Sequence, residues 1–394
     1  MHIASTIQLQ SRLPEVGTTI FTVMSALANE HHAVNLGQGF PDFAGDPLLP
    51  EAVHQAMVHG HNQYPPMAGV LKLREAIASK TQQLYGHAYD PGNEVTVTAG
   101  ATQALLTAVL ALTQAGDDVM LLEPCYDSYL PSVQMAGCQA VRVPLNPLTF
   151  RPDFDLIKAS ITPRTRLLII NTPHNPSGIC WTAEEMNELA AILRNTGIVL
   201  LSDEVYEHMV YDGQVHQSVV RHPELRERSL VVSSFGKTFH VTGWKVGYVL
   251  GPSALMGEFR KVHQFNVFTV NTPMQMGLSQ YLQDPTPYLQ LPDFYAQKRD
   301  HFREGLRTLP FELLPCEGTY FQCVRYKSLE WPNAPRHDAE FCTWLTREIG
   351  VAAIPMSAFY AQPIESQVIR FCFAKKQETM NDALVRLQRY SAQM

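Results

Sequence analysis

The sequence lacks three features, and each absence excludes a class of protein. No apolar stretch approaches the roughly 18 residues that a membrane-spanning helix needs. Only seven cysteines occur in 394 residues and none forms a C-x-x-C pair, which argues against a zinc site and against a disulfide framework. Basic residues do not dominate, because 30 Lys and Arg stand against 37 Asp and Glu, for a net charge of -7. A mildly acidic chain without a long basic run is a poor candidate for binding nucleic acid.

Two further absences concern targeting and metals. The first 17 residues carry Gln8, Gln10 and Arg12 where a signal peptide would need its apolar stretch. We therefore expect a cytoplasmic protein that contacts no membrane. The 15 histidines include His59 and His61, but they form no cluster typical of a metal site, and we expect no metal.

The residues that are present predict a large α/β protein. An apolar fraction of 45% and a charged fraction of 17% are enough for extensive cores, and the length predicts two or three domains. Between residues 93 and 252 short apolar runs alternate with helical patterns, one of which begins with a capping box of Thr182 and Glu185. Strands are predicted at Glu94–Ala99, Asp118–Glu123, Arg166–Asn171, Ile198–Ser202, Leu230–Ser233 and Trp244–Gly251. This alternation predicts a mostly parallel sheet sandwiched by helices.

The pattern changes after about Pro292. Helices are predicted at Asp293–Leu309, Asp338–Gly350 and Lys376–Ser391, and strands within Phe311–Tyr326 and at Val351–Pro355 and Val368–Phe373. These elements predict a smaller α+β domain, and we expect the turn-rich residues 1–45 to pack with it. The predicted organisation is an N-terminal segment (1–45), a large domain (46–292) that would bind a cofactor, and a small C-terminal domain (293–394).

Polar residues follow five of the predicted strands at the point where each strand ends. Ligands of parallel α/β sheets bind at this edge, so we expect these side chains to share one crevice. In chain order the groups are Gly100-Ala101-Thr102, Pro124 with Tyr126, Asn171 to Pro176, Asp203 to Tyr206, and Ser233 to Lys237.

One ligand would use all of these groups. Thr102 opens a helix behind a small-residue turn, and its free backbone N–H groups, with Ser234, make a phosphate site. Asp203 follows a fully apolar strand, so its carboxylate needs a cationic partner such as a protonated ring nitrogen. Lys237 lies in an apolar surrounding that would lower its pKa and make it a nucleophile. A phosphate, a pyridinium and an aldehyde in one molecule describe pyridoxal phosphate.

Each residue also has an ordinary interpretation when it is taken alone. Lys237 could be a surface lysine, Asp203 a solvated loop residue and Tyr126 a core aromatic. The joint occurrence at successive strand ends, in this order, is what favours the cofactor site.

The same residues carry a family resemblance. Asn171–Gly178, Ser202–Tyr206, Ser234–Gly247 and Ile369–Ala374 resemble segments of the fold-type-I, class I/II pyridoxal-phosphate aminotransferases, in the family's order. Further segments resemble the subgroup that contains kynurenine, glutamine and methionine aminotransferases: Asn35–Phe43, Asn62–Tyr64 and Val262–Phe268. Gly17–Met24 resembles the bacterial methionine aminotransferases within that subgroup.

The resemblance implies a role for each cofactor-binding residue. Lys237 matches the lysine that forms the Schiff base and Asp203 the carboxylate on the pyridine nitrogen. Tyr206 and Asn175 match the groups on the ring's phenolic oxygen, and Tyr126 matches the stacked aromatic. The phosphate contacts would be Gly100, Ala101, Thr102, Ser234 and Lys245.

The resemblance also implies a substrate site and a homodimer. Arg370 matches the arginine that binds the substrate α-carboxylate, and the backbone of Gly39 would contact the same group. Phe21, with Phe40 nearby, lies where pocket aromatics are expected. Tyr64 and Phe268 match residues that reach across a dimer interface, toward the phosphate and the substrate respectively.

The chain departs from the family pattern at a few positions. Lys245 stands where the broad family has arginine, so its phosphate contact is a point charge rather than a bidentate fork. Thr102, Phe21 and Thr269 also differ from some relatives, which leaves the substrate side chain open. We expect transamination between an amino acid, methionine or aromatic, and a 2-oxo acid.

Three alternatives stay open at this stage. A C–S β-lyase or a kynurenine aminotransferase would use the same scaffold. A regulator that senses an effector would need a DNA-binding segment ahead of the fold, and we see no basic helix-turn-helix pattern in the first 30 or so residues.

Overall fold

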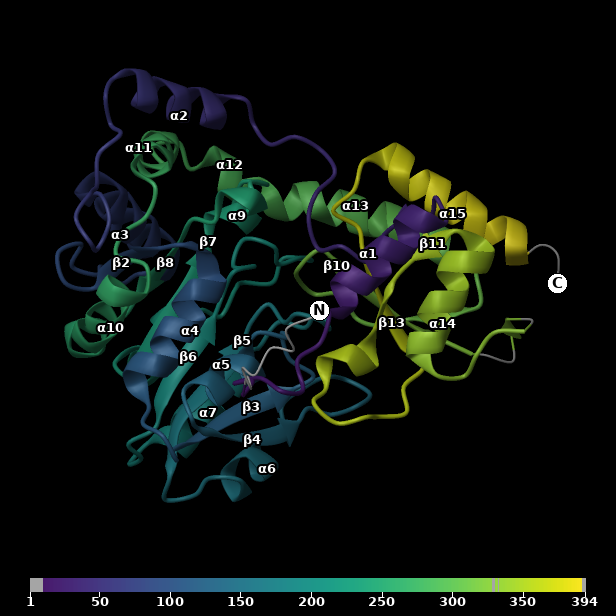
Figure 1. Ribbon diagram of the computed structural model, residues 1–394, viewed down its shortest axis with the longest axis horizontal. Helices are drawn as coiled ribbons and strands as arrows, with labels where there is room; N and C mark the ends of the chain where they lie inside the picture. Colours follow the sequence, from purple (N-terminus) through teal and green to yellow (C-terminus); the bar gives the residue numbers. More distant parts are fainter. Residues whose placement is uncertain (1–9, 328–329, 332, 392–394) are drawn as a thin grey trace, which may run out of the picture.

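The computed structural model describes residues 10–327, 330–331 and 333–391. Its centre is a seven-stranded sheet in the order β2-β8-β7-β6-β5-β3-β4 (Figure 1). The strands are β2 (Val95–Thr98), β3 (Asp118–Glu123), β4 (Gln139–Pro144), β5 (Thr165–Asn171), β6 (Val199–Asp203), β7 (Ser229–Ser234) and β8 (Gly247–Leu250). All are parallel except β8, which pairs antiparallel with both β2 and β7. The prediction of a mostly parallel sheet is confirmed.

The inner strands form because their apolar side chains alternate between two buried faces. Along β3, Met120 and Leu122 pack with one core, whereas Val119 and Leu121 pack with the core on the opposite face. This alternation is what the period of two in a strand produces. The edge strand β4 was not predicted, since its exposed and half-buried residues lack an apolar run.

Helices cover both faces of this sheet, as predicted. On one face lie α3 (Leu71–Tyr85) and α7 (Ala183–Leu193), and on the other α4 (Gly100–Leu112), α5 (Tyr129–Met135) and α10 (Ser253–Asn266). The remaining helices of this region are α2 (Leu48–Val58), α6 (Phe154–Ala159), α8 (Pro223–Arg226), α9 (Phe235–Thr238), α11 (Thr272–Tyr281) and α12 (Thr286–Leu289). The predicted capping box at α7 is confirmed, because Thr182 and Glu185 each accept a backbone N–H of the other.

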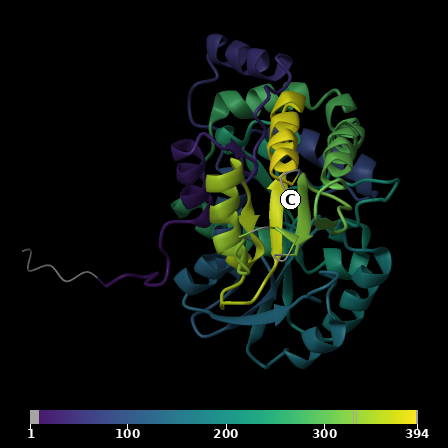
Figure 2. The ribbon, with the colours of Figure 1, turned by 90° about the vertical axis from the view of Figure 1, so that its right-hand side faces the viewer.

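A second group of elements packs around a separate core (Figure 2). Its four-stranded antiparallel sheet has the order β12-β13-β10-β9. These strands are β9 (Phe311–Leu313), β10 (Phe321–Tyr326), β12 (Ile354–Pro355) and β13 (Val368–Cys372). The helices are α13 (Leu291–Leu306), α14 (Asp338–Trp344) and α15 (Gln377–Ser391). The predicted helix over 338–350 ends differently, since Leu345–Ile349 is a wider π-helical turn.

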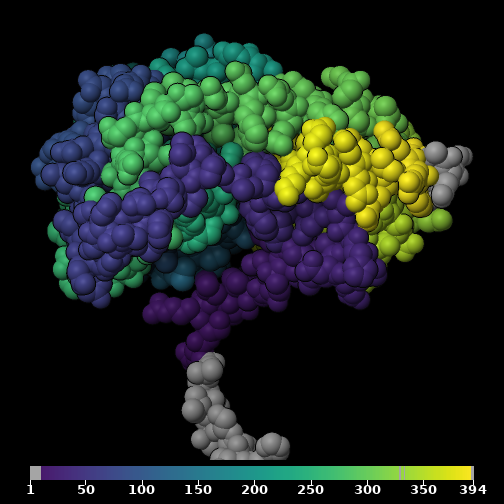
Figure 3. All heavy atoms as spheres, turned by 90° about the horizontal axis from the view of Figure 1, so that it is seen from above, coloured from purple at the N-terminus to yellow at the C-terminus, as the bar shows by residue number. Residues whose placement is uncertain are grey.

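The N-terminal segment lies against this second group. Helix α1 (Ile20–Glu30) is followed by β1 (Val34–Asn35), which pairs in parallel with β11 (Val351–Ala352). Residues 10–19 run out from the body ahead of α1 (Figure 3). The first nine residues of the predicted N-terminal segment lie outside the described residues, and the boundaries at 45 and 292 stay a prediction. Within the described part of the chain, no helix combines the length and apolar character needed to cross a membrane.

Candidate active site

The antiparallel strand β8 completes the site that the parallel strands begin. Strands β2, β3, β5, β6 and β7 end at one edge of the sheet, and β8 starts at that same edge because it runs the other way. The residues that precede β8, among them Lys245, are therefore delivered to the edge where Asp203 and Ser234 end their strands.

A cavity of about 170 Å³ lies at this edge. It brings together all the predicted cofactor-binding residues except Tyr64: Gly100, Ala101, Thr102, Tyr126, Asn175, Asp203, Tyr206, Ser234, Lys237 and Lys245. The prediction that the strand ends share one crevice is thereby confirmed, while the role of each residue stays a prediction. A larger groove of about 840 Å³ lies between α2, α3 and α11, but none of its lining residues belongs to a strand end.

The start of helix α4 forms one wall of the cavity. Gly100 opens the helix with a positive φ of 77°, and a Cβ atom there would lie 3.3 Å from the amino nitrogen of Lys245. Glycine thus allows the lysine to lie close to the first free N–H groups of the helix. Helix N–H groups, the Ser234 hydroxyl and a cation are the donors that hold a phosphate.

Asp203 is buried at the end of β6 and, among the residues that the structure describes, forms no ion pair. Its side chain is 3% exposed and accepts a 2.7 Å hydrogen bond from the Tyr129 hydroxyl and another from the Val205 N–H. Burial outweighs these bonds and raises the pKa of the Asp203 carboxyl to about 6. A ligand cation beside Asp203 would lower this pKa again and keep the carboxyl ionised.

Lys237 is held by oxygen acceptors rather than by a carboxylate. Its Nζ donates to the Tyr320 hydroxyl at 2.8 Å and to the Gly39 carbonyl at 3.2 Å. Burial lowers the pKa of this lysine to about 8. An amine that loses its proton this readily can serve as a nucleophile and as a base.

Arg370 contacts Asn175, one of the residues that line the cavity. The guanidinium is 1% exposed, donates to the Asn175 Oδ1 at 2.6 Å and to the Gly37 carbonyl at 3.3 Å, and keeps Nε without a partner. The rings around it belong to Phe321, Phe359 and Phe21, at 3.8, 4.9 and 5.5 Å from the guanidinium carbon. Within the described residues no carboxylate pairs with Arg370. The guanidinium therefore keeps at least two N–H groups that could donate to a carboxylate ligand.

Asn171 fixes the loop that carries Asn175. The Asn171 Oδ1 accepts the Asn175 N–H at 2.7 Å, and its Nδ2 donates to the Asp203 carbonyl at 2.8 Å. One amide therefore ties the loop after β5 to the end of β6.

Six predicted residues are not among those that line the cavity. Three of them contact the site: the Gly39 carbonyl accepts from Lys237, Arg370 donates to Asn175, and Phe21 lies beside Arg370. The other three lie farther out. Tyr64 is 82% exposed and its ring meets Phe268, which is 48% exposed, edge-on at 5.3 Å. The Phe40 ring lies 5.1 Å from the Lys375 amino group and is half exposed. The assignment of these three residues to the site stays a prediction.

Two tyrosines at the site were missed by sequence reasoning. Tyr129 touches Asp203, and Tyr320 touches Lys237. Tyr129 lies three residues after Tyr126, at a strand end that had already been noted, so the region was identified but not the residue. Tyr320 carries no comparable signal, because its contact with Gly39 joins residues 281 positions apart.

Within residues 10–327, 330–331 and 333–391, no three His, Cys, Asp or Glu side chains lie close enough together to bind a metal ion.

Comparison with known proteins gives a consistent result. The family model "Aminotransferase class I and II" matches residues 31–387. Methionine aminotransferase of Escherichia coli is 50% identical over 96% of this chain and 97% of that protein. A probable N-succinyldiaminopimelate aminotransferase of Mycobacterium tuberculosis is 40% identical, over 96% and 97% of the two chains. The crystal structure of an E. coli protein with methionine aminotransferase function superposes with a TM-score of 0.94 at 50% identity, over 97% and 100% of the two chains.

The free energy of unfolding should depend on pH because the pKa of the buried Asp203 carboxyl is raised. In the ligand-free protein its pKa of about 6 exceeds the roughly 3.9 of an unfolded chain, so the folded state binds the proton more tightly. The free energy of unfolding should therefore fall as pH rises from about 4 to about 6, by roughly 3 kcal/mol from this group, and stay lower above. Asp203→Asn should lack this fall, as measured by denaturant unfolding across that range. The exposed Asp155→Asn should follow the wild type, and an unaltered pH profile in Asp203→Asn would contradict the account.

Proposed function

The chain belongs to the class I and II aminotransferases, which use pyridoxal phosphate, and from this premise we propose that it transfers the amino group of methionine and aromatic amino acids to a 2-oxo acid. We propose further that it acts as a homodimer in the cytoplasm. The observation that carries the substrate proposal is the buried, carboxylate-free Arg370 among aromatic rings.

The cavity fits the cofactor on grounds of its own chemistry. A Cβ at Gly100 would crowd the Lys245 side chain at 3.3 Å, and Asp203 is a buried carboxylate that lines the cavity, where a cationic partner could lie. Asp203 would hold the ring nitrogen, Tyr126 would face the ring, and the start of α4 with Ser234 and Lys245 would hold the phosphate. When bound, pyridoxal phosphate supplies an aldehyde and an electron sink for the charge that forms at the substrate α-carbon.

Lys237 would carry the proton in the reaction. Its side chain is partly buried, and its pKa of about 8 leaves a neutral fraction near physiological pH. The Nζ atom would take the proton from the substrate α-carbon and later return it, as a general base and then an acid.

Arg370 and Asn175 would orient the substrate. The guanidinium offers its unpaired Nε and its outer N–H groups to an α-carboxylate, and the bond from Nη1 to Asn175 fixes its plane. A fixed guanidinium binds a carboxylate in a bidentate manner, which sets the direction of the α-hydrogen.

The side-chain end of the substrate would lie among uncharged rings. Phe21 and Phe359 meet edge-on at 6.0 Å beside Arg370, and Tyr126 lines the neighbouring cavity. Thioether–aromatic contacts are worth about 0.3–1.5 kcal/mol, enough for a preference but not for strict specificity. The name of the E. coli relative agrees with methionine as a donor, whereas N-succinyldiaminopimelate, named for the M. tuberculosis relative, carries additional carboxylates that these rings would leave unpaired.

Exposed aromatic side chains support the dimer. Tyr64 and Phe268 form a pair on the surface, and Phe265 is 86% exposed. Aromatic side chains left this open on a monomer are typical of an interface between proteins. The resemblance places Tyr64 and Phe268 across a two-fold axis, where each subunit would complete the site of the other.

The seven thiols are free and buried in the described structure. Unpaired thiols suit a reducing compartment, which supports a cytoplasmic location; exclusive recovery in another cell fraction would contradict it.

A panel of amino donors against several 2-oxo acids tests the substrate proposal. Methionine should head a broad range that includes phenylalanine, tyrosine, histidine, glutamine and kynurenine. Arg370→Ala should lower kcat/KM for all donors alike by about 100-fold or more, the size expected when a charged hydrogen-bond partner is lost. Phe21→Ala should reduce kcat/KM most for large apolar donors, by up to about tenfold.

Two results of the panel would contradict the proposal. Aspartate or N-succinyldiaminopimelate as the best donor by kcat/KM would show that the interpretation of the pocket is wrong. Pyruvate and thiol released from a cysteine conjugate, without any oxo acid present, would instead favour the C–S β-lyase.

Subunit mixing tests the shared active site. Lys237→Ala and Tyr64→Ala chains should each be nearly inactive, yet mixed dimers contain one site with both native residues. Full exchange should restore roughly a quarter of the wild-type activity, because half of the dimers are mixed and each has one complete site. Lys237→Ala mixed with a chain that carries both substitutions should stay inactive. Failure to recover activity after proven exchange, or an active monomer, would contradict the dimer.

A further inference from the structure

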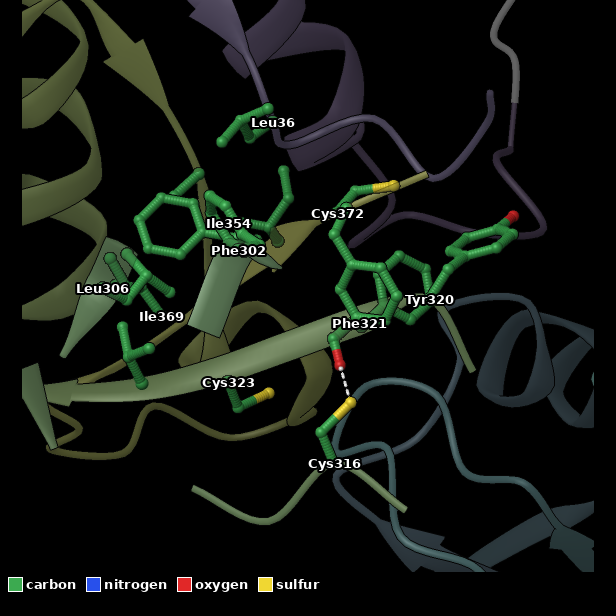
Figure 4. Close-up of a cluster of buried hydrophobic side chains, with 14 of the residues drawn as sticks. Leu36, Phe302, Leu306, Cys316, Tyr320, Phe321, Cys323, Ile354, Ile369 and Cys372 are labelled. Carbon is green, nitrogen blue, oxygen red and sulfur yellow. Dashed lines mark hydrogen bonds between the residues drawn. The ribbon is translucent and has the colours of Figure 1, made fainter. Parts of the chain in front are cut away.

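Tyr320 places a hydroxyl beside the catalytic lysine. The residue directly precedes β10 and is fully buried, and its ring packs against Phe321 and Tyr206 at 4.9 and 5.2 Å. In Figure 4 its hydroxyl points away from the apolar side chains that surround the ring. A buried phenol needs a hydrogen-bond partner, and this one finds its partners at the site.

The Tyr320 hydroxyl is bonded in a defined direction. It donates its single proton to the Gly39 carbonyl and so presents its lone pairs to the Lys237 Nζ at 2.8 Å. The same Nζ donates to the Gly39 carbonyl at 3.2 Å. The lysine amine, the phenol and the carbonyl therefore form a closed triangle of hydrogen bonds.

The hydrogen bonds of this triangle matter because no charged group pairs with Lys237 in the described structure. The titratable and charged groups facing Lys237 from the neighbouring elements are Asp203, Tyr206, Lys245, Arg370 and Cys372. None of them forms an ion pair with Lys237 in the described structure, so the two oxygen acceptors are what holds the amine. The Tyr320 ring also meets edge-on the ring of Tyr206, a residue that the resemblance assigns to the cofactor.

We propose that Tyr320 is a positioning residue that, together with the Gly39 carbonyl, holds the ε-amino group of Lys237 whenever this amine is not bonded to the cofactor. The inference rests on the role of Lys237 proposed above. An amine held at one place carries the α-proton from a fixed position and over a fixed distance. The substrate carboxylate is expected at the backbone of Gly39, so the same residue would contact both the substrate and the free lysine.

The chain offers a matched pair of variants. Tyr320→Phe removes the hydroxyl and keeps the ring. Tyr295 is equally buried and its ring lies 5.8 Å from that of Tyr320, but its hydroxyl has no hydrogen-bond partner in the described structure. Tyr295→Phe therefore makes the same chemical change in the same cluster without breaking a bond.

Kinetics and lysine titration would be read together. Tyr320→Phe should lower kcat by about tenfold or more with little change in the KM of the donor, as expected when a hydrogen bond to a charged group is lost after substrate binding. In holoenzyme converted to the pyridoxamine phosphate form, where the lysine is free, competitive acylation with mass mapping should give a lower pKa for Lys237 in Tyr320→Phe, because one acceptor that stabilises the ammonium is gone. Tyr295→Phe should match the wild type in both measurements.

Three results would overturn the inference. One is a Tyr320→Phe enzyme that matches Tyr295→Phe in kcat and in the pKa of Lys237. Another is a loss of kcat without any change in that pKa, which would indicate a structural role alone. The third needs no variant: in a crystal structure of the wild-type pyridoxamine phosphate form, the Lys237 Nζ should lie within hydrogen-bond distance of the Tyr320 hydroxyl, and a different location would exclude the proposal. A wild-type protein without transaminase activity would instead refute the proposed function.

Discussion

The structure depends on three charged side chains that lie in the protein interior without a partner of opposite charge. Asp203 and Arg370 are almost fully removed from water and Lys237 is partly buried, and within the described residues none of the three forms an ion pair. Burying an unpaired charge costs several kcal/mol per ion, which a fold retains only where a ligand supplies the missing charge or where the chemistry requires it. A pyridinium nitrogen would supply the charge opposite to Asp203, and an α-carboxylate the charge opposite to Arg370. Lys237 differs, because its lowered pKa favours the neutral amine that reacts with an aldehyde carbon.

The fold holds these groups in place through contacts between distant parts of the chain. Asp203 and Lys237 come from the ends of neighbouring parallel strands, whereas Arg370 lies on β13 of the second sheet. Asn175, Gly37 and Gly39 bridge the two regions, since they accept hydrogen bonds from Arg370 and Lys237. The site therefore forms only where the two cores meet, and its geometry depends on how they pack.

The sequence was informative wherever a local pattern determines the structure. Apolar runs such as that of β5 identified the inner strands, and Thr182 with Glu185 identified the start of α7. The site residues at strand ends could be predicted because parallel strands deliver their ends to one edge. The direction of β8, the exposed edge strand β4 and the contact of Tyr320 with Gly39 could not, because each depends on packing between segments far apart in sequence.

The central claim is that Lys237 is the residue that binds pyridoxal phosphate covalently. Reduction of the holoenzyme with borohydride, followed by proteolysis and mass mapping, fixes the cofactor to whichever lysine holds it. The account predicts a single pyridoxyl group on Lys237, and Lys237→Ala should yield none. A label on Lys245, which lies in the same cavity and 3.3 Å from the position of a Gly100 Cβ, would contradict it.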